Sequence, residues 1–333
     1  MKNFNEIYQK IHTEKSSIVE EERKKDLNKF IVIICIAIII SLTLNVMQFN
    51  HGAVLVLLIL GVISIFFLIG GKHNSMYKQL IINSLIKEIS DKLSYNPNGR
   101  MNSVDYRSAE FEKFDIFTSE DYITGIMDDE TKIEIAEVKT KNESRDEDGN
   151  KTQTTVFHGL FGSIKIKEYI TLQMKIHSNR EILGKILNSR TRLEMDSSEF
   201  EKYFDVYTKD KMIGMQLLTS DVMLKLIEFR QKINKEYEIT IKNSHIYIRI
   251  KCGEVFEASK LKETMDYNTL KNYYDMLNLF FEISEQIKNN IKQIKESKFH
   301  EQILYNNTNI LSKWKISYRN SIFNNSSICI KKI

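Results

Sequence analysis

The fold is decided by two apolar runs, FIVIICIAIIISLTLNVM at residues 30–47 and AVLVLLILGVISIFFLIG at residues 53–70. Neither run contains a charged side chain. At about 1.5 Å per residue, a helix of this length spans about 27 Å, close to the ~30 Å hydrocarbon layer of a bilayer. We therefore predict a two-helix transmembrane hairpin over residues 30–71, with the lipid bilayer as a partner of the chain.

The basic residues around this hairpin predict its orientation. The link between the two runs, residues 48–52, is too short to hold a domain and contains no Lys or Arg. Basic side chains flank the outer ends instead: Arg23, Lys24, Lys25 and Lys29 on one side, Lys72 and Lys78 on the other. Because basic flanks remain cytoplasmic, we expect a two-span protein of the inner (plasma) membrane with both termini in the cytoplasm.

Two other interpretations of the apolar runs fit less well. Buried helices of a soluble protein seldom come as two adjacent uncharged runs with basic outer flanks. A cleaved signal peptide begins near the N-terminus, whereas the first run lies behind a long charged segment. No small-residue cleavage pattern separates the two runs either.

Composition limits what the remaining chain can be. Of the 333 residues, those after about Ser75 suffice for one large or two small hydrophobic cores. The 48 basic and 44 acidic residues nearly balance, which argues against a nucleic-acid partner. The three cysteines, Cys35, Cys252 and Cys329, form no CxxC pair and no metal-ligand spacing. The sequence therefore predicts neither a metal site nor a cofactor.

Apolar residues at helical spacing lie on both sides of the hairpin. Residues 1–29 form an amphipathic helix pattern, and residues 72–98 repeat it up to the breaker that begins at Asn96. Because tightly joined spans are antiparallel neighbours, the two extensions leave the membrane side by side, and we expect a short helical stalk. The alternative, in which each stripe lies on the bilayer surface or on the globular domain, stays open.

Residues 99–190 change to a period of two, which is typical of half-buried strands. Strands are expected at Tyr122–Met127, Lys132–Thr140, Thr152–Phe161 and Tyr169–His177. The charged stretch 141–150 is typical of a long hairpin loop. This region is the first α+β half of the predicted cytoplasmic domain.

Residues 191–298 form the second α+β half. Thr219 is a suitable N-cap for a helix that runs to about Lys235, and the alternation from Tyr237 to Ile250 predicts a hairpin. A long helix is expected from Asn268 to about Lys295, followed by a weakly ordered tail, residues 299–333. The fold class is therefore α+β, with antiparallel strands and packed helices.

The two halves share a short sequence pattern. FEKFDIFT at residues 111–118 is matched by FEKYFDVYT at residues 200–208, and each copy runs into an acidic turn. A duplicated unit, in which a short helix leads into a strand, explains the match. Chance similarity in a chain rich in Lys, Glu and Phe explains it equally well, so a true duplication stays open.

Several stretches together resemble a bacterial membrane-protein family known as domain of unknown function 3137. They are Phe200–Asp210 with Leu217-Leu218-Thr219, Phe256-Glu257, Glu120–Gly125 and Gly159–Phe161. The resemblance covers roughly residues 78–295 and implies two N-terminal spans and no particular activity. The chain departs from the family pattern in two places: Ser220 replaces an expected proline, and Ile213-Gly214-Met215 replaces an expected charged segment.

Candidate site residues are few, because the sequence contains no nucleophile elbow, P-loop or HExxH motif. Asp121 and Asp210 stand in the two acidic turns and would pair as general acid and base if the repeats face each other. Turn capping explains both more simply and predicts that Asn can replace either. His158 could ligate or shuttle protons, although a lone histidine beside a strand is more often on the surface or half-buried. No residue is predicted to be catalytic.

The functional prediction is a membrane-anchored cytoplasmic protein that acts as a non-enzymatic interaction, scaffold or sensing module. A protein partner is compatible with it, and the sequence specifies no oligomeric state. The alternative is a membrane-tethered enzyme that uses acidic residues near the repeated turns. A groove with converging polar groups of shifted pKa favours the enzyme, whereas an exposed apolar patch or an open sheet edge favours partner binding.

Overall fold

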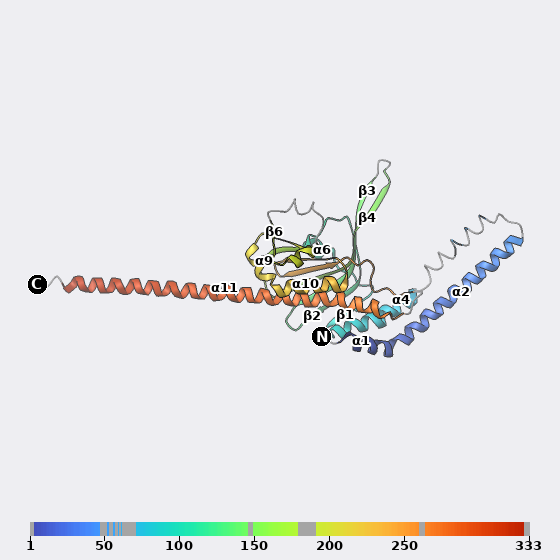
Figure 1. The fold of residues 1–333 in the computed structure, drawn as a ribbon, viewed down its shortest axis with the longest axis horizontal. Coiled ribbons are helices and arrows are strands. Elements are labelled where there is room, and N and C mark those ends of the chain that lie inside the picture. The colour runs from blue at the N-terminus through green and yellow to red at the C-terminus, as the bar shows by residue number, and fades with distance from the viewer. Residues whose placement is uncertain are drawn as a thin grey trace.

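The computed structural model describes residues 3–46, 52, 56, 59, 61, 71–145, 149–178, 191–259 and 264–329; for residues 44–46 and 299–329 it describes the backbone alone. Its centre is an antiparallel sheet of nine strands in the order β1-β2-β3-β4-β9-β8-β5-β7-β6 (Figure 1). The strands are β1 Leu93–Asn96, β2 Ile116–Ile126, β3 Lys132–Arg145, β4 Lys151–Lys165, β5 Gln173–Ser178, β6 Arg192–Leu193, β7 Phe204–Thr208, β8 Tyr237–Lys242 and β9 His245–Ile250.

Helices precede, interrupt and follow the sheet. Those before it are α1 Phe4–Ile11, α2 Ser17–Val46, α4 Gly71–Tyr77 and α5 Asn83–Ile89, with two π-helical turns, η1 His12–Ser16 and η2 Lys78–Ile82. The others are α6 Ser103–Ala109, α8 Ser198–Tyr203, α9 Lys211–Leu217, α10 Ser220–Ile233 and α11 Tyr267–Cys329. The α+β class is confirmed.

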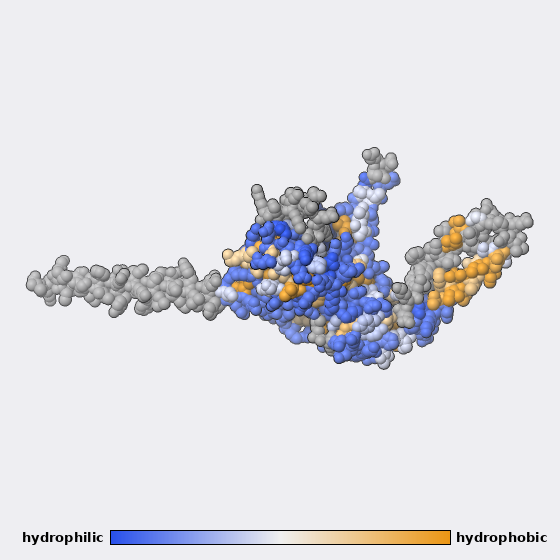
Figure 2. Space-filling view, viewed as in Figure 1, coloured by the Kyte–Doolittle hydropathy of each residue, from blue (hydrophilic) through white to orange (hydrophobic). Residues whose placement is uncertain are grey.

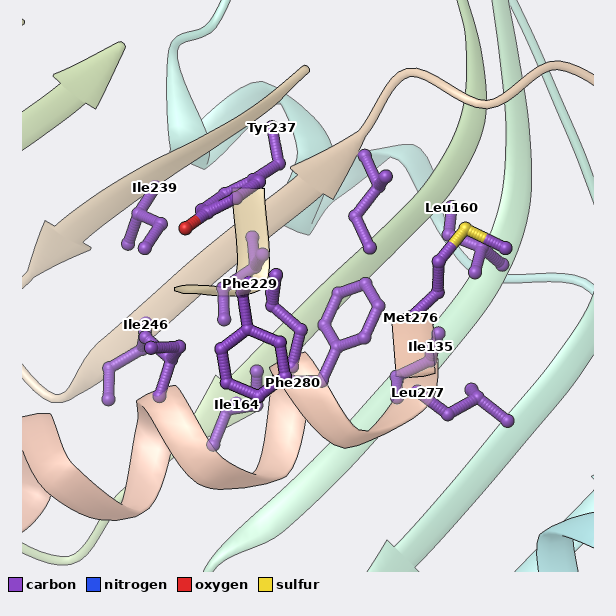
Figure 3. Packing of buried hydrophobic residues seen from close by; sticks show 14 of the residues in the cluster. Ile135, Leu160, Ile164, Phe229, Tyr237, Ile239, Ile246, Met276, Leu277 and Phe280 are labelled. Atoms are coloured by element: carbon purple, nitrogen blue, oxygen red, sulfur yellow. The ribbon is translucent and has the colours of Figure 1, made fainter. Parts of the chain in front are cut away.

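The main core lies between one face of the sheet and the helices α10 and α11. Alternate residues of the central strands point to this face, and Phe280 of α11 packs among them (Figure 3). Phe280 lies against β4 at Gly162, where a Cβ atom would come within 2.5 Å of its ring. Glycine at this position therefore lets the helix approach the strand closely. A smaller aromatic cluster, centred on Tyr106 of α6, covers part of the opposite face.

One helix of the predicted hairpin is described. The segment Phe4–Thr43 contains a helix that is long and apolar enough to cross a membrane, judged by length and composition. Exposed isoleucines of α2, such as Ile36 and Ile39, give it an apolar surface away from the domain (Figure 2). The second predicted span, residues 53–70, lies largely outside the described residues, so the two-helix hairpin stays a prediction.

The helices on either side of the predicted hairpin lie side by side and antiparallel. α1 lies beside α5, η1 beside η2, and α2 beside α4. They also pack on the domain: the ring centroids of Phe4 and Tyr274 of α11 are 5.2 Å apart. The paired helices bury their apolar stripes both against each other and against α11. The structure therefore has features of both expectations, a helical stalk and packing on the globular domain.

Several predicted boundaries need correction. The helix expected over residues 72–98 ends at Ile89, and β1 follows because its backbone pairs with β2 along the sheet edge. Much of the loop expected at residues 141–150 is strand, since β3 and β4 continue into it and bond across through Ser144 and Thr152. The long helix starts as expected but extends to Cys329. Weak order in the tail stays a prediction.

The hairpin of the second half is confirmed: β8 and β9 pair, and Asn243 takes the positive φ that its two-residue turn needs. The helix α10 begins after Thr219, as expected, but the Thr219 side chain makes no capping hydrogen bond. The duplication is not confirmed. Residues 199–202 are helical, whereas the matching residues 110–113 follow the end of α6 and are not. One sheet holds both halves, because β5 lies between β8 and β7.

Candidate functional site

Asp121 lies at a bulge of β2, where the register with β3 shifts between Glu120 and Ile123. Its backbone has a φ of 55°, a left-handed conformation that is uncommon for a residue other than glycine. The bulge turns its carboxylate into the core, where the residue is fully buried. There Oδ2 accepts a hydrogen bond from Lys78 Nζ (2.8 Å), and Oδ1 accepts one from the Tyr95 hydroxyl (2.5 Å).

Lys78 is the first residue of η2, and it bridges two acids. Besides Asp121, its ammonium group contacts the carboxylate of Glu257. Burial lowers the pKa of Lys78, but the hydrogen bonds to the two acids outweigh this and raise it above its ordinary value. The lysine is therefore charged at neutral pH. With Asp121 and Glu257 it forms an ion cluster that ties the start of η2 to the sheet.

Residues 251–259, which follow β9, run from the pair formed by His158 and Glu137 to this ion cluster. We call this segment the strap. At its far end, Glu257 accepts a hydrogen bond from Asn74 Nδ2 (2.5 Å), and the Ala258 N–H donates to Asn74 Oδ1 (2.8 Å). Near its start, the Gly253 N–H donates to the carbonyl of His158 (3.0 Å). The strap is thus bonded to α4 on one side and to β4 on the other.

Phe256 holds the middle of the strap. It is fully buried, and its φ of 61° is a genuine outlier for a bulky side chain. The Tyr95 and Tyr273 rings meet it edge-on, with centroids 6.2 and 5.1 Å away. A strained backbone of this kind persists only where the surrounding packing determines it, and such outliers cluster at functional sites.

His158 and Glu137 form a pair beside the strap. His158 Nε2 lies 2.7 Å from Glu137 Oε1, and the Val255 N–H donates to Glu137 Oε2 (2.8 Å). Glu137 is 3 % exposed. Burial raises the pKa of its carboxyl, against the lowering effect of the two hydrogen bonds. A buried acid that orients a half-exposed imidazole is an arrangement suited to proton transfer or to ligand recognition.

A polar groove of about 460 Å³ opens at this pair. Its lining includes Arg100, Glu120, Lys139 and Glu254 together with Glu137 and His158. In the described part of the chain, no ion pair engages Arg100, Lys139, Glu120 or Glu254. Charged side chains of both signs are therefore available to a bound molecule.

Asp210 lies elsewhere and has a different role. It is the N-cap of α9, and its Oδ1 accepts a hydrogen bond from the Ile213 N–H (3.0 Å). It follows β7, the eighth strand across the sheet, whereas Asp121 belongs to β2, the second. Six steps at about 4.8 Å separate these strands by about 29 Å. The two acids therefore cannot act as an acid and base pair. Asp210 is a helix cap, whereas Asp121 belongs to the ion cluster.

Other polar groups have structural partners. On the opposite sheet face, Arg249 is buried between the rings of Phe111 and Phe157 and is ion-paired with Glu238. A cavity of about 780 Å³ beside α11 contains the contact between Lys288 and Asp129. Within the described ranges, no cluster of three or more His, Cys, Asp or Glu side chains is placed to hold a metal ion.

Sequence reasoning missed Glu137, Lys78 and Glu257. The first two carried a usable signal, because each interrupts an apolar pattern with a charge. Glu137 continues the alternation of Ile133 and Ile135, and Lys78 lies within the apolar stripe of the second extension. A charge on a buried face needs a partner, which predicts a buried pair but not the identity of the partner.

Comparison with known proteins adds a family and no activity. Residues 155–289 match the model of the family described as "Protein of unknown function (DUF3137)", which confirms the resemblance seen in the sequence. No curated protein matches. A solved structure, titled "crystal structure of the mycobacterial trehalose monomycolate transport factor A, TtfA", aligns with 62 % of this chain and 94 % of its own at 8 % identity and a TM-score of 0.33. This score is too low to indicate a shared fold.

Proposed function

We propose that this chain, with its DUF3137 region, is a membrane-anchored cytoplasmic module that binds a partner in the groove beside His158 without catalysing a reaction. The observation that carries the proposal is the set of uncommitted charged side chains around that groove, Arg100 and Lys139 with Glu120 and Glu254. Charged groups of both signs favour a partner that itself carries both signs, such as a protein segment.

The proposed topology has two spans and both termini in the cytoplasm. The basic flanks of the apolar runs support this orientation. The contacts of α1 with α11, and of Asn74 in α4 with residues 257 and 258, also support it. Helices that pack on the domain lie on the same side of the membrane as the domain.

An open strand edge also supports partner binding. β4 pairs with β9 only from Leu160 to Lys165, so residues 151–157 have no described strand on that side. This part of β4 belongs to the β3–β4 arm, which projects from the body (Figure 1). An open edge accepts an extended peptide through backbone hydrogen bonds.

Site-specific photo-crosslinking in cells tests the proposal. A photoreactive residue in place of Glu120, in the groove, should give a discrete adduct with a partner protein. The same residue in place of the exposed Glu228 on α10 serves as the control and should not. Adding Arg100→Ala and Lys139→Ala should remove the Glu120 adduct. Identical adducts at both positions, or an adduct that survives both alanine changes, would contradict a binding groove.

A second candidate function is enzymatic, and the hydrogen-bonded His158–Glu137 pair is the observation that favours it. An imidazole held by a buried acid is suited to general base catalysis. His158→Gln keeps an N–H donor for Glu137 but does not titrate. Loss of a cellular phenotype in this variant, at matched abundance and with the groove adduct retained, would support an enzyme. Retention of the phenotype supports the binding module.

A further inference from the structure

We infer that the strap, residues 251–259, couples the groove to the membrane-proximal helix, so that a molecule bound at His158 alters how α4 and η2 are held. The identity of the groove as a binding site rests on the proposed function. The mechanical link itself is carried by contacts that need no ligand.

At the groove end, the carboxylate of Glu137 bonds both to the groove and to the strap. Glu137 uses one oxygen for His158 and the other for the Val255 N–H of the strap. A bound molecule that draws His158 away leaves a buried carboxylate with one partner fewer. Because uncompensated buried charge is costly, Glu137 and its bond to Val255 must then rearrange.

In the middle, the strap is stiff. Phe256 is buried between the Tyr95 and Tyr273 rings and has a positive φ, so it cannot adjust by small side-chain movements alone. Tyr95 also donates its hydroxyl to Asp121. A displacement of Phe256 therefore reaches the ion cluster through Tyr95 as well as along the strap.

At the membrane end, Glu257 shares the ammonium group of Lys78 with Asp121 and accepts a hydrogen bond from Asn74. Asn74 belongs to α4 and Lys78 to η2, which lies beside the other π-helical turn, η1. π-Helical turns are often found at functional sites. Withdrawing Glu257 removes contacts from both α4 and η2, so the effect reaches the paired helices that lead to the membrane.

Hydrogen exchange of the full chain in lipid nanodiscs, followed by mass spectrometry, tests the coupling. Glu137→Ala should speed exchange in residues 253–258 and also, by about threefold or more, in residues 71–82. Glu134→Ala is the matched control, because this glutamate is on the same strand but bonds to Tyr122 on the opposite face. It should leave residues 71–82 unchanged. Faster exchange at 253–258 with no change at 71–82 overturns the inference.

Coupling must also operate in reverse, since linkage between two sites is reciprocal. Asn74→Ala removes the bonds to Glu257 and Ala258 and leaves Lys78 with its acids. It should speed exchange at residues 253–255, next to the groove; unchanged exchange there overturns the inference. If Glu137→Ala does not fold, Glu137→Gln and His158→Ala repeat the forward test. Because no ligand is needed, this result is separate from the crosslinking result, and either can fail alone.

Discussion

Lys78 Nζ lies 2.8 Å from Asp121 Oδ2, and the two side chains are 7 % and 0 % exposed. Lys78 belongs to the helical turn η2, and Asp121 belongs to the bulge of β2. Removing water from both charges is costly, and the pair is maintained because Glu257 and Tyr95 complete its hydrogen bonds. Removing one partner of such a pair leaves the other charge buried with less compensation, which is strongly destabilising.

Asp121→Asn should therefore destabilise the domain, by about 3 kcal/mol, because a buried ammonium group loses one of its two acids. Asp210→Asn should change the free energy of unfolding by about 0.5 kcal/mol or less, since Asn caps helices as well as Asp does. Urea unfolding of both variants in mild detergent measures the difference. The sequence predicted that Asn could replace either Asp in a turn. In the structure, this expectation holds for Asp210 alone. Equal stability of the two variants would contradict the ion-cluster role of Asp121.

Gly162→Ala should destabilise the core by about 1 to 3 kcal/mol, because its methyl group would overlap the Phe280 ring. In a Phe280→Leu background, Gly162→Ala should cost less than it does in the wild type, because the smaller side chain leaves room for the methyl group. The measurement is a double-mutant cycle on thermal or urea unfolding. Strict additivity of the two changes would show that the close approach of α11 to β4 is not the cause.

Acid should weaken the attachment of α2 to Thr264, in the segment that precedes α11. Hydrogen bonds from Arg23, and further ones from Thr264, lower the pKa of Glu20 from 4.5 to about 2. A carboxyl whose pKa is lowered on folding stabilises the folded state, and this contribution is fully present above pH 4.5. It is lost as the pH falls from 4.5 through about 2. The stability difference between the wild type and Glu20→Gln should shrink over that interval. A difference that is constant with pH would contradict this assignment.

The antiparallel order of the paired helices can be checked with cysteines in a background where Cys35, Cys252 and Cys329 are serines. Lys10 Nζ lies 2.5 Å from Glu88 Oε1. Lys10→Cys with Glu88→Cys should therefore cross-link with a short bifunctional reagent. Lys10→Cys with Lys72→Cys should not, because Lys72 lies at the other end, paired with Glu22. Cross-linking of the second pair alone would show that the paired helices are not in this antiparallel order.

Membrane topology is tested by fusions after Lys295. A reporter active only in the cytoplasm should work there, and one that requires export should not. The basic residues outside both apolar runs are the reason for this expectation. The reverse pattern of reporter activity would contradict the cytoplasmic placement of the sheet domain.

Local patterns in the sequence determined several elements of this protein. The apolar run in α2, the alternation from Tyr237 to Ile250 and the start of α10 after Thr219 each depend on neighbours within a few residues, and each appears in the structure as expected. The continuation of β3 and β4 into the charged stretch was missed, because side-chain bonds across the hairpin stabilise strands that local polarity does not indicate.

Only the tertiary structure decided the sheet order and the candidate site. β5 pairs with β7 and β8, which come later in the chain, and no local pattern encodes that choice. The site likewise joins Asp121 to Lys78 across 43 residues, and Glu137 to Val255 across 118. The sequence determines which residues are charged on a buried face. Which of them meet depends on how the helices and strands pack, because a buried charge can be satisfied by any suitable partner that the fold brings within reach.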